Sequence, residues 1–162
     1  MIPYLDCKET VKAFNLSADG DTMWVRDTNI FGIKVQRSWH PNRQPKEIAH
    51  FNDKGQRHGL RETWREDGTR IDSTMYEDGN IIEIREYFYN GNIRQFMKDK
   101  EGKLYSAIFY DPKGKVTGRI EKGTGKSIGF SEDGKQRWLD VYENGRRVDS
   151  RELEPGENPS LR

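Results

Sequence analysis

The chain is built from short segments in which apolar and polar residues alternate, separated by polar turns that contain glycine. Residues 33–39 place Ile33, Val35 and Trp39 at alternate positions, and residues 104–110 alternate in the same way. Alternation with a period of two indicates a β-strand. Other segments carry charged residues at both sets of alternate positions, so neither face is apolar enough to form the interior of a β-sandwich. The pattern predicts a thin, single-layer sheet.

The turns recur at a nearly constant spacing from residue 51 onward. In most of them an aromatic or apolar residue is followed by two or three polar residues and then by glycine. The turn glycines are Gly55, Gly68, Gly79, Gly91, Gly102, Gly114, Gly123, Gly134 and Gly145. Successive glycines lie 9 to 13 residues apart. This spacing leaves about seven residues for each strand, which is a normal strand length.

The residues of these turns suit β-hairpin connections. In residues 110–114, Asp111 fits the first position of a type I turn and Pro112 the second, because the φ angle of proline is preset. Gly114 then supplies a residue at positive φ, as in a type I turn with a glycine bulge. Asp-Gly and Asn-Gly pairs, which are strong hairpin signals, occur at 78–79, 133–134 and 144–145. We therefore expect a long antiparallel meander of hairpins.

One turn contains Gly-Lys-Ser, which resembles the end of a phosphate-binding loop. That loop needs a further glycine five positions before its second glycine and a helix after its serine. The required position holds Ile120, and residues 128–134 predict a short strand and a turn instead. Gly123 continues the series of turn glycines. Residues 121–129 are therefore predicted to form a hairpin connection.

Residues 55–70 contain, in order, a glycine, a basic residue, His-Gly, an aromatic residue and Asp-Gly. These residues are Gly55, Arg57, His58, Gly59, Trp64, Asp67 and Gly68. The order resembles the MORN repeat, and the later repeats are similar to a bacterial MORN variant found in antitoxin-like and immunity-like proteins. The resemblance covers residues 47–148 clearly and 13–46 weakly. It implies an array of β-hairpins that binds other proteins, and it implies no catalytic residues.

The repeat predicts three parts of the chain: an N-terminal cap segment at 1–12, the MORN-like hairpin array at 13–148, and a polar C-terminal tail at 149–162. In the first part of the array the turn signal is weaker, and Asn42 stands where other turns have glycine. We expect Asn42 to adopt the left-handed backbone conformation there, because asparagine tolerates positive φ better than most residues.

Composition and charge exclude several classes of function. Hydrophobic residues make up 32% of the 162 residues and charged residues 34%, while mean hydropathy is -1.05. The 28 basic and 27 acidic residues are interspersed, so no basic stripe predicts nucleic-acid binding. The single cysteine, Cys7, excludes an intrachain disulfide and a multi-cysteine zinc site. We expect a cytoplasmic protein, or a periplasmic one if a leader was removed.

The aromatic residues fall into two groups. Those that belong to the repeat are expected to pack over turn glycines, and they are Phe51, Trp64, Tyr76, Tyr87, Tyr110, Phe130 and Tyr142. Off-pattern aromatics and nearby arginines are the candidates for a partner surface, because Trp, Tyr and Arg dominate interface hot spots. These partner-binding candidates are Trp24, Arg61, Arg65, Arg85, Phe88, Tyr89, Arg94, Phe96, Tyr105 and Trp138. The alternative is that their rings thicken a thin core.

These features predict a non-catalytic protein that binds another protein. The resemblance to the bacterial MORN variant implies, more specifically, an immunity or antitoxin protein that neutralises a cognate toxin. No cofactor or metal site is expected, because His40, His50 and His58 lack a supporting acidic cluster, and no nucleophile lies in a recognisable catalytic context. Two alternatives remain. One is a membrane-associated scaffold that binds anionic phospholipid headgroups, although membrane contact is not expected at a net charge of +1. The other is an aromatic-ladder carbohydrate-binding module. The sequence leaves the oligomeric state open.

Overall fold

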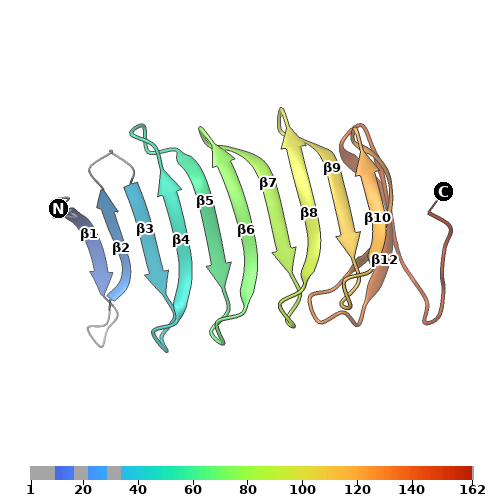
Figure 1. Cartoon of the computed structure of the whole chain (residues 1–162), viewed down its shortest axis with the longest axis horizontal. Coiled ribbons are helices and arrows are strands. Elements are labelled where there is room, and N and C mark those ends of the chain that lie inside the picture. The colour runs from blue at the N-terminus through green and yellow to red at the C-terminus, as the bar shows by residue number, and fades with distance from the viewer. Residues whose placement is uncertain (1–9, 17–21, 29–33, 162) are drawn as a thin grey trace, which may run out of the picture.

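The computed structural model describes residues 10–16, 22–28 and 34–161, with side chains from residue 34 onward. The described residues form thirteen strands in one antiparallel sheet, and the strands lie side by side in their sequence order (Figure 1). The strands are β1 (Thr10–Leu16), β2 (Thr22–Thr28), β3 (Lys34–Trp39), β4 (Pro45–Phe51), β5 (Arg57–Trp64), β6 (Arg70–Glu77), β7 (Asn80–Tyr87), β8 (Ile93–Lys100), β9 (Lys103–Tyr110), β10 (Val116–Glu121), β11 (Thr124–Phe130), β12 (Arg137–Glu143) and β13 (Arg146–Glu152). The predicted all-β, single-layer meander is confirmed. A helix with the length and apolar character needed to cross a membrane does not occur in the described part of the chain.

The array is longer at both ends than the predicted range of 13–148. β1 already begins at Thr10, while residues 1–9 of the predicted cap lie outside the described residues. At the other end β13 continues to Glu152, which lies opposite Trp138 of β12. The predicted tail therefore starts too early at residue 149, because the backbone of residues 149–152 pairs with β12.

The turns have the predicted hairpin chemistry. In the loop between β9 and β10, the side chain of Asp111 accepts hydrogen bonds from the backbone N–H groups of Lys113 and Lys115, both at 2.9 Å. Gly114 has a φ of 85° and donates its N–H to the carbonyl oxygen of Asp111. The type I turn followed by a glycine at positive φ is therefore confirmed.

The structure confirms two further predicted turns and corrects the prediction for a third. The two-residue turn at residues 78–79 has positive φ at both positions, as a type I′ turn requires. Residues 121–129 form the predicted hairpin connection, with β10 ending at Glu121 and β11 beginning at Thr124. The prediction for Asn42 was wrong, since Arg43 has the positive φ of 66°. Asn42 instead uses its side-chain oxygen to accept from the N–H of Gln44 and its nitrogen to donate to the carbonyl of Glu66.

Cross-strand pairing divides the side chains of β5–β13 into two faces, because residues directly opposite each other project to the same side of a sheet. One row of paired residues runs Arg61, Thr74, Ile84, Met97, Ala107, Ile120, Gly125 and Tyr142. A parallel row on the same face runs Thr63, Asp72, Glu86, Gln95, Phe109, Gly118, Ser127, Asp140 and Ser150. We call this side the inner face and the opposite side the outer face.

The sheet rolls over its inner face at the C-terminal end. β9 and β10 separate β8 from β11 in the sheet, yet Arg94 of β8 donates a hydrogen bond to the carbonyl of Phe130 at the end of β11 (3.1 Å). The Phe88 ring packs edge-on against Phe130, with centroids 6.3 Å apart. Figure 1 shows the strands overlapping at this end of the molecule, where the sheet turns sharply. The roll therefore encloses part of the inner face.

The enclosed part holds a small hydrophobic core. Ala107, Phe109 and Ile120 are buried, and Met97, Leu104 and Tyr142 pack against them. Glycines in β10 and β11 permit this close packing. A Cβ on Gly118 would lie 2.4 Å from the Cα of Ser127, so only glycine fits there without movement of the backbone.

The repeat aromatics do not all pack over turn glycines. Tyr76 lies directly opposite Gly59, and Tyr142 lies opposite Gly125, and both of these glycines belong to strands. Trp64 and Tyr87 lie on the outer face, because they follow inner-face residues in their strands by one position. The repeat therefore places its aromatics on both faces of the sheet, and the register of each strand decides which face each ring occupies.

Candidate binding surfaces on the two faces of the sheet

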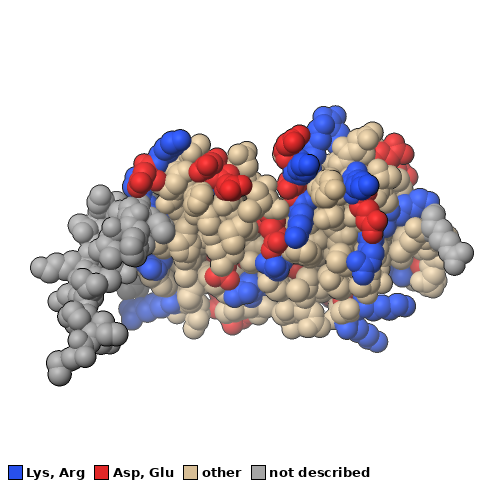
Figure 2. All heavy atoms as spheres, turned by 45° about the horizontal axis from the view of Figure 1, so that its top comes forward, with Lys and Arg blue, Asp and Glu red and all other residues tan. Residues whose placement is uncertain are grey.

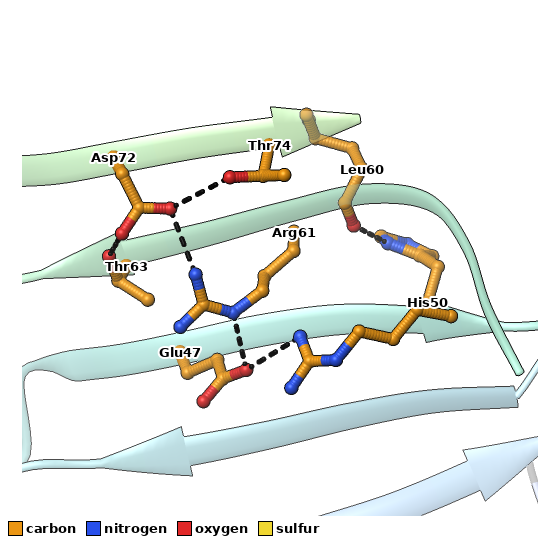
Figure 3. Close-up of polar contacts among 8 residues, drawn as sticks. Glu47, His50, Leu60, Arg61, Thr63, Asp72 and Thr74 are labelled. Atoms are coloured by element: carbon orange, nitrogen blue, oxygen red, sulfur yellow. Dashed lines mark hydrogen bonds and ion pairs between the residues drawn. The ribbon is translucent and has the colours of Figure 1, made fainter. Parts of the chain in front are cut away.

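A cluster of charged side chains occupies the inner face across β4, β5 and β6 (Figure 3). The guanidinium of Arg61 lies between two carboxylates, with Nε 2.9 Å from Glu47 Oε1 and Nη1 2.9 Å from Asp72 Oδ1. Thr63 and Thr74 donate their hydroxyls to the Asp72 carboxylate, and Arg57 Nη1 lies 3.2 Å from Glu47 Oε1. Each charge in the cluster therefore has an opposite charge or a hydrogen-bond partner.

The electrostatics of this cluster favour its charged state. Burial opposes the positive charge of Arg61, but its hydrogen bond with Glu47 and the negative charge of Asp72 raise the pKa of the guanidinium above its ordinary value. A charge that has satisfied partners of this kind contributes order to the sheet rather than reactivity. We therefore assign the Arg61 cluster a structural role.

Arg94 forms a second charged centre farther along the same face. It is the extra residue of a β-bulge, because Glu86 lies opposite Gln95 while Tyr87 lies opposite Ile93. Its Nη2 donates to the carboxylate of Glu86. Its Nε is buried and donates to no protein atom among the described residues. Arg94 therefore retains one unused donor inside the roll.

Two cavities lie along the inner face and share Arg94. The first has a volume of about 330 Å³ and lies over β5–β8; its lining includes Arg61, Ile71, Ile84, Glu86 and Glu132. The second has a volume of about 440 Å³ and lies between β8–β9 and β11–β13. Both volumes are within the range of about 300–1,000 Å³ that is typical of ligand sites.

The second cavity combines aromatic walls with polar groups. Its lining residues are Arg94, Gln95, Phe109, Gly129, Phe130, Trp138, Asp140, Tyr142, Arg147 and Ser150. The side chain of Asp140 is only 9% exposed, and Arg147 Nη1 approaches it to 3.4 Å. Burial raises the pKa of the Tyr142 hydroxyl, and the nearby charge of Asp140 adds to this effect. Tyr142 is therefore a neutral hydroxyl at pH 7.

The rim of the roll is held by a contact between the loops after β5 and β11. Arg65 Nη2 lies 2.7 Å from Glu132 Oε2, and the backbone N–H of Tyr89 donates to the carbonyl of Glu132 at 3.2 Å. The Arg65 guanidinium also lies over the Tyr89 ring, 4.3 Å from its centroid. The ion pair joins two residues that are 67 positions apart in sequence. We call these contacts together the Arg65–Glu132 contact.

The outer face carries apolar and basic side chains together. One row of opposite residues on this face runs Glu62, Ser73, Arg85, Phe96, Ile108, Arg119, Lys126 and Val141. The Arg85 guanidinium lies 4.9 Å from the Phe96 ring centroid, and Arg70 lies 5.6 Å from that of Tyr87. Acidic and basic side chains are interspersed over the face seen in Figure 2. No second layer of described residues covers the outer face.

The predicted partner-binding residues do not form one surface. Arg61, Arg94 and Trp138 line the two inner cavities. Arg65 and Tyr89 lie at the rim contact. Arg85 and Phe96 lie side by side on the outer face. Tyr105, which is 44% exposed, is the extra residue of a bulge between β8 and β9.

Phe88 and Trp24 differ from the other predicted partner-binding residues. Phe88 was predicted for the partner surface, but it is 1% exposed and packs against Phe130, so it belongs to the core. The roll buries it, and the local pattern of β7 contains no sign of the roll. Trp24 lies in β2, opposite Ser38, and its side chain is outside the part of the chain that the structure describes.

Sequence reasoning missed several residues of the second cavity. Gln95, Asp140, Arg147 and Ser150 carried no motif, and Tyr142 was assigned to the repeat alone. Their positions in neighbouring strands give a usable signal, because Asp140 and Ser150 lie directly opposite each other. That signal becomes visible only when the strand register is known.

The histidines have structural partners. His40 Nε2 and His50 Nδ1 lie within hydrogen-bond distance of the backbone carbonyls of Trp64 (2.7 Å) and Leu60 (2.6 Å). His58 Nδ1 lies 3.2 Å from Asp78 Oδ1 in the adjacent turn. A group of three potential metal ligands does not occur in the described part of the chain.

The chain was compared with known proteins. Neither a scan against protein-family models nor a search of curated proteins returned a match. The resemblance to MORN repeats therefore remains a prediction from the sequence.

Proposed function

We propose that this chain is a non-catalytic binding protein of the immunity or antitoxin type, which neutralises a cognate toxin by direct contact through its outer face. The observation that supports this proposal best is the pairing of aromatic and basic side chains on a sheet face that no second layer covers. The MORN-like turns support the same class of function.

The outer face has the composition of an interaction surface. Ile93 and Val116 are exposed on it at 37% and 40%, and Phe96 lies between Arg85 and Lys98. Exposed apolar groups surrounded by polar residues are typical of protein interaction sites. Arginine and aromatic residues also contribute most of the affinity at such sites.

The architecture favours binding without a large entropic cost. The residues that contact the partner lie in strands whose backbones are paired on both sides, so they lose little conformational freedom when the complex forms. Acidic side chains accompany the basic ones on this face, because Arg85 Nη2 lies 2.6 Å from Glu83 Oε1 and Asp149 lies opposite Val141. We therefore expect the toxin to present a partly apolar surface with charges of both signs.

The proposal is tested by affinity capture with the tagged chain from a lysate of its source organism, followed by co-expression. We expect one protein to be recovered in stoichiometric amount, to be toxic when expressed alone, and to be harmless when expressed with this chain. Recovery of anionic lipid in place of a protein, with binding to phosphatidylserine vesicles, would contradict the proposal.

The binding face is tested with neighbouring residues of β8 that project to opposite sides. Phe96→Ala removes an outer-face ring and is expected to weaken toxin binding at least tenfold, as at a hot spot. Gln95→Ala changes the inner face and is expected to leave toxin binding unchanged. Surface plasmon resonance with the captured toxin measures both. A loss caused by Gln95→Ala alone would place the interface on the inner face instead.

A further inference from the structure

The second inner cavity has a chemical character that the proposed contact with a toxin does not use. Phe130, Trp138 and Tyr142 form aromatic walls around a volume of about 440 Å³. The Phe109 ring packs beside Tyr142, with centroids 6.0 Å apart, and holds that ring in place. The cavity faces inward, whereas the proposed toxin contact lies on the outer face.

The polar groups of this cavity have unused hydrogen-bonding capacity. In the described structure, no protein atom hydrogen-bonds to the side chain of Gln95, the hydroxyl of Tyr142 or the indole N–H of Trp138. Among the described residues, the carboxylate of Asp140 is engaged only by the long 3.4 Å contact with Arg147. The cavity therefore offers a mixture of donors and acceptors at its aromatic walls.

The charges of the cavity disfavour ionic ligands. An anion that approached Arg94 and Arg147 would also meet the buried carboxylate of Asp140 and the carboxylate of Glu86. A cation that approached Asp140 would meet the two guanidinium groups instead. Like charges at close range cost free energy in a partly desolvated site. The cavity therefore suits a neutral ligand.

We propose that this cavity binds a ring of a neutral carbohydrate. A pyranose ring has an apolar face of C–H groups, which packs on aromatic side chains, and hydroxyl groups at its edge that both donate and accept hydrogen bonds. The ring stacks on Trp138, while its hydroxyls bind Gln95, Asp140 and the hydroxyl of Tyr142. The exposed Arg147, whose side chain is 58% accessible, moves aside or donates to the ligand.

The test uses the purified full chain and needs no toxin. Binding is measured by isothermal titration calorimetry and by tryptophan fluorescence with methyl glycosides of glucose, galactose, mannose and N-acetylglucosamine, and with hexasaccharides of glucose, xylose and N-acetylglucosamine. We expect saturable binding of at least one neutral sugar in the millimolar range or tighter. Gln95→Ala and Tyr142→Phe should each weaken it about fivefold, since each removes one hydrogen-bonding group.

Controls separate this inference from the proposed function. Phe96→Ala, on the opposite face of β8, should leave sugar binding unchanged while it weakens toxin binding. Circular dichroism verifies that Gln95→Ala and Tyr142→Phe remain folded. The inference is overturned if no neutral sugar binds at concentrations up to about 10 mM, or if the Gln95→Ala/Tyr142→Phe double variant binds sugar with the same affinity as the wild type. Binding of inorganic phosphate or tetramethylammonium in preference to sugars would overturn it as well.

Discussion

Glycines in strands and glycines in turns have different physical roles in this sheet. Gly114 adopts a φ of 85° in a turn, and an added Cβ there would meet no atom within 4 Å. Gly118 lies in β10, where an added Cβ would approach the Cα of Ser127 to 2.4 Å and the carbonyl oxygen of Lys126 to 2.7 Å. The turn glycine is required by its backbone conformation, and the strand glycine is required by the packing of β10 against β11.

This difference predicts unequal effects of the same substitution. Gly118→Ala should lower the free energy of unfolding by about 2–4 kcal/mol, because the backbones of β10 and β11 must move apart. Gly114→Ala should cost about 1 kcal/mol, which is the penalty for a left-handed alanine. Urea denaturation of both variants measures these values. Equal losses would show that the close approach at Gly118 has no energetic consequence.

Asp99 is a carboxylate whose pKa is raised by burial, and it has no ion-pair or hydrogen-bond partner among the described residues. Its position opposite Leu104, which packs on the core, explains this burial. Burial makes the charged carboxylate less favourable in the folded state than it is in the unfolded state. The folded chain therefore binds a proton more tightly at Asp99 than the unfolded chain does.

This shift predicts how stability depends on pH. The contribution of Asp99 is fully present below its ordinary pKa of 3.8 and is lost as the pH rises through the higher pKa of the folded state. Asp99→Asn should therefore be more stable than the wild type at pH 7, and the difference should disappear near pH 3. Thermal unfolding measured across this range tests the prediction, and a constant difference at all pH values would contradict it.

At the level of the elements, bulges at equivalent positions give the sheet its twist. The extra residue of the bulge is Ile71, Ile82, Arg94, Tyr105, Thr117 or Val148. In each case it is the third residue after a turn glycine. A bulge increases the local right-handed twist and turns one side chain away from the regular alternation. This regular placement explains why Ile82, Tyr105 and Val148 are exposed hydrophobics.

The charged cluster across β4–β6 predicts that removal of its central cation, Arg61, destabilises the folded state. Arg61→Met should lower the free energy of unfolding by about 2–3 kcal/mol, because Glu47 and Asp72 would remain half-buried without their partner. The triple variant that also carries Glu47→Gln and Asp72→Asn should recover more than half of this loss. Chemical denaturation of the wild type, Arg61→Met and the triple variant measures their free energies of unfolding. A triple variant no more stable than Arg61→Met would show that the charges are not the cause.

At the level of the whole molecule, the roll depends on contacts between segments that are distant in the chain. The Arg65–Glu132 contact joins the loop after β5 to the loop after β11, and Arg94 joins β8 to Phe130. These contacts set the shape of the two inner cavities, because Arg94 lines both and Glu132 lines the first. Binding at the inner face should therefore respond to changes at the rim.

The rim contact can be tested by exchange of its charges. Glu132→Arg should open the roll, raise hydrogen exchange in residues 131–136 and increase the radius of gyration measured by X-ray scattering. The double variant Arg65→Glu/Glu132→Arg should restore part of the contact, with a coupling energy of about 0.5–1 kcal/mol. If both variants have the wild-type radius of gyration, the core around Phe109 holds the roll without this pair.

The repeat pattern was sufficient to predict the strands and turns because both are set by local chemistry. Asp111, Pro112 and Gly114 favour one type of turn whatever surrounds them, and alternation defines a strand without reference to its neighbours. The same argument excluded a phosphate-binding loop at residues 121–129. It failed for Asn42, where the neighbouring turn at Glu66 binds the asparagine side chain and leaves positive φ to Arg43.

The sequence by itself determined that the chain forms a long antiparallel meander with hairpins at nearly constant spacing. It also determined which residues occupy the turns, because turn conformation depends on a few adjacent residues. Only the tertiary structure decided which face each side chain occupies and where the sheet rolls. A bulge shifts the alternation by one residue, and the roll brings β8 against β11 across two intervening strands. The position of Phe88 in the core and the gathering of Trp138, Asp140 and Tyr142 around one cavity follow from that long-range geometry, which local patterns do not contain.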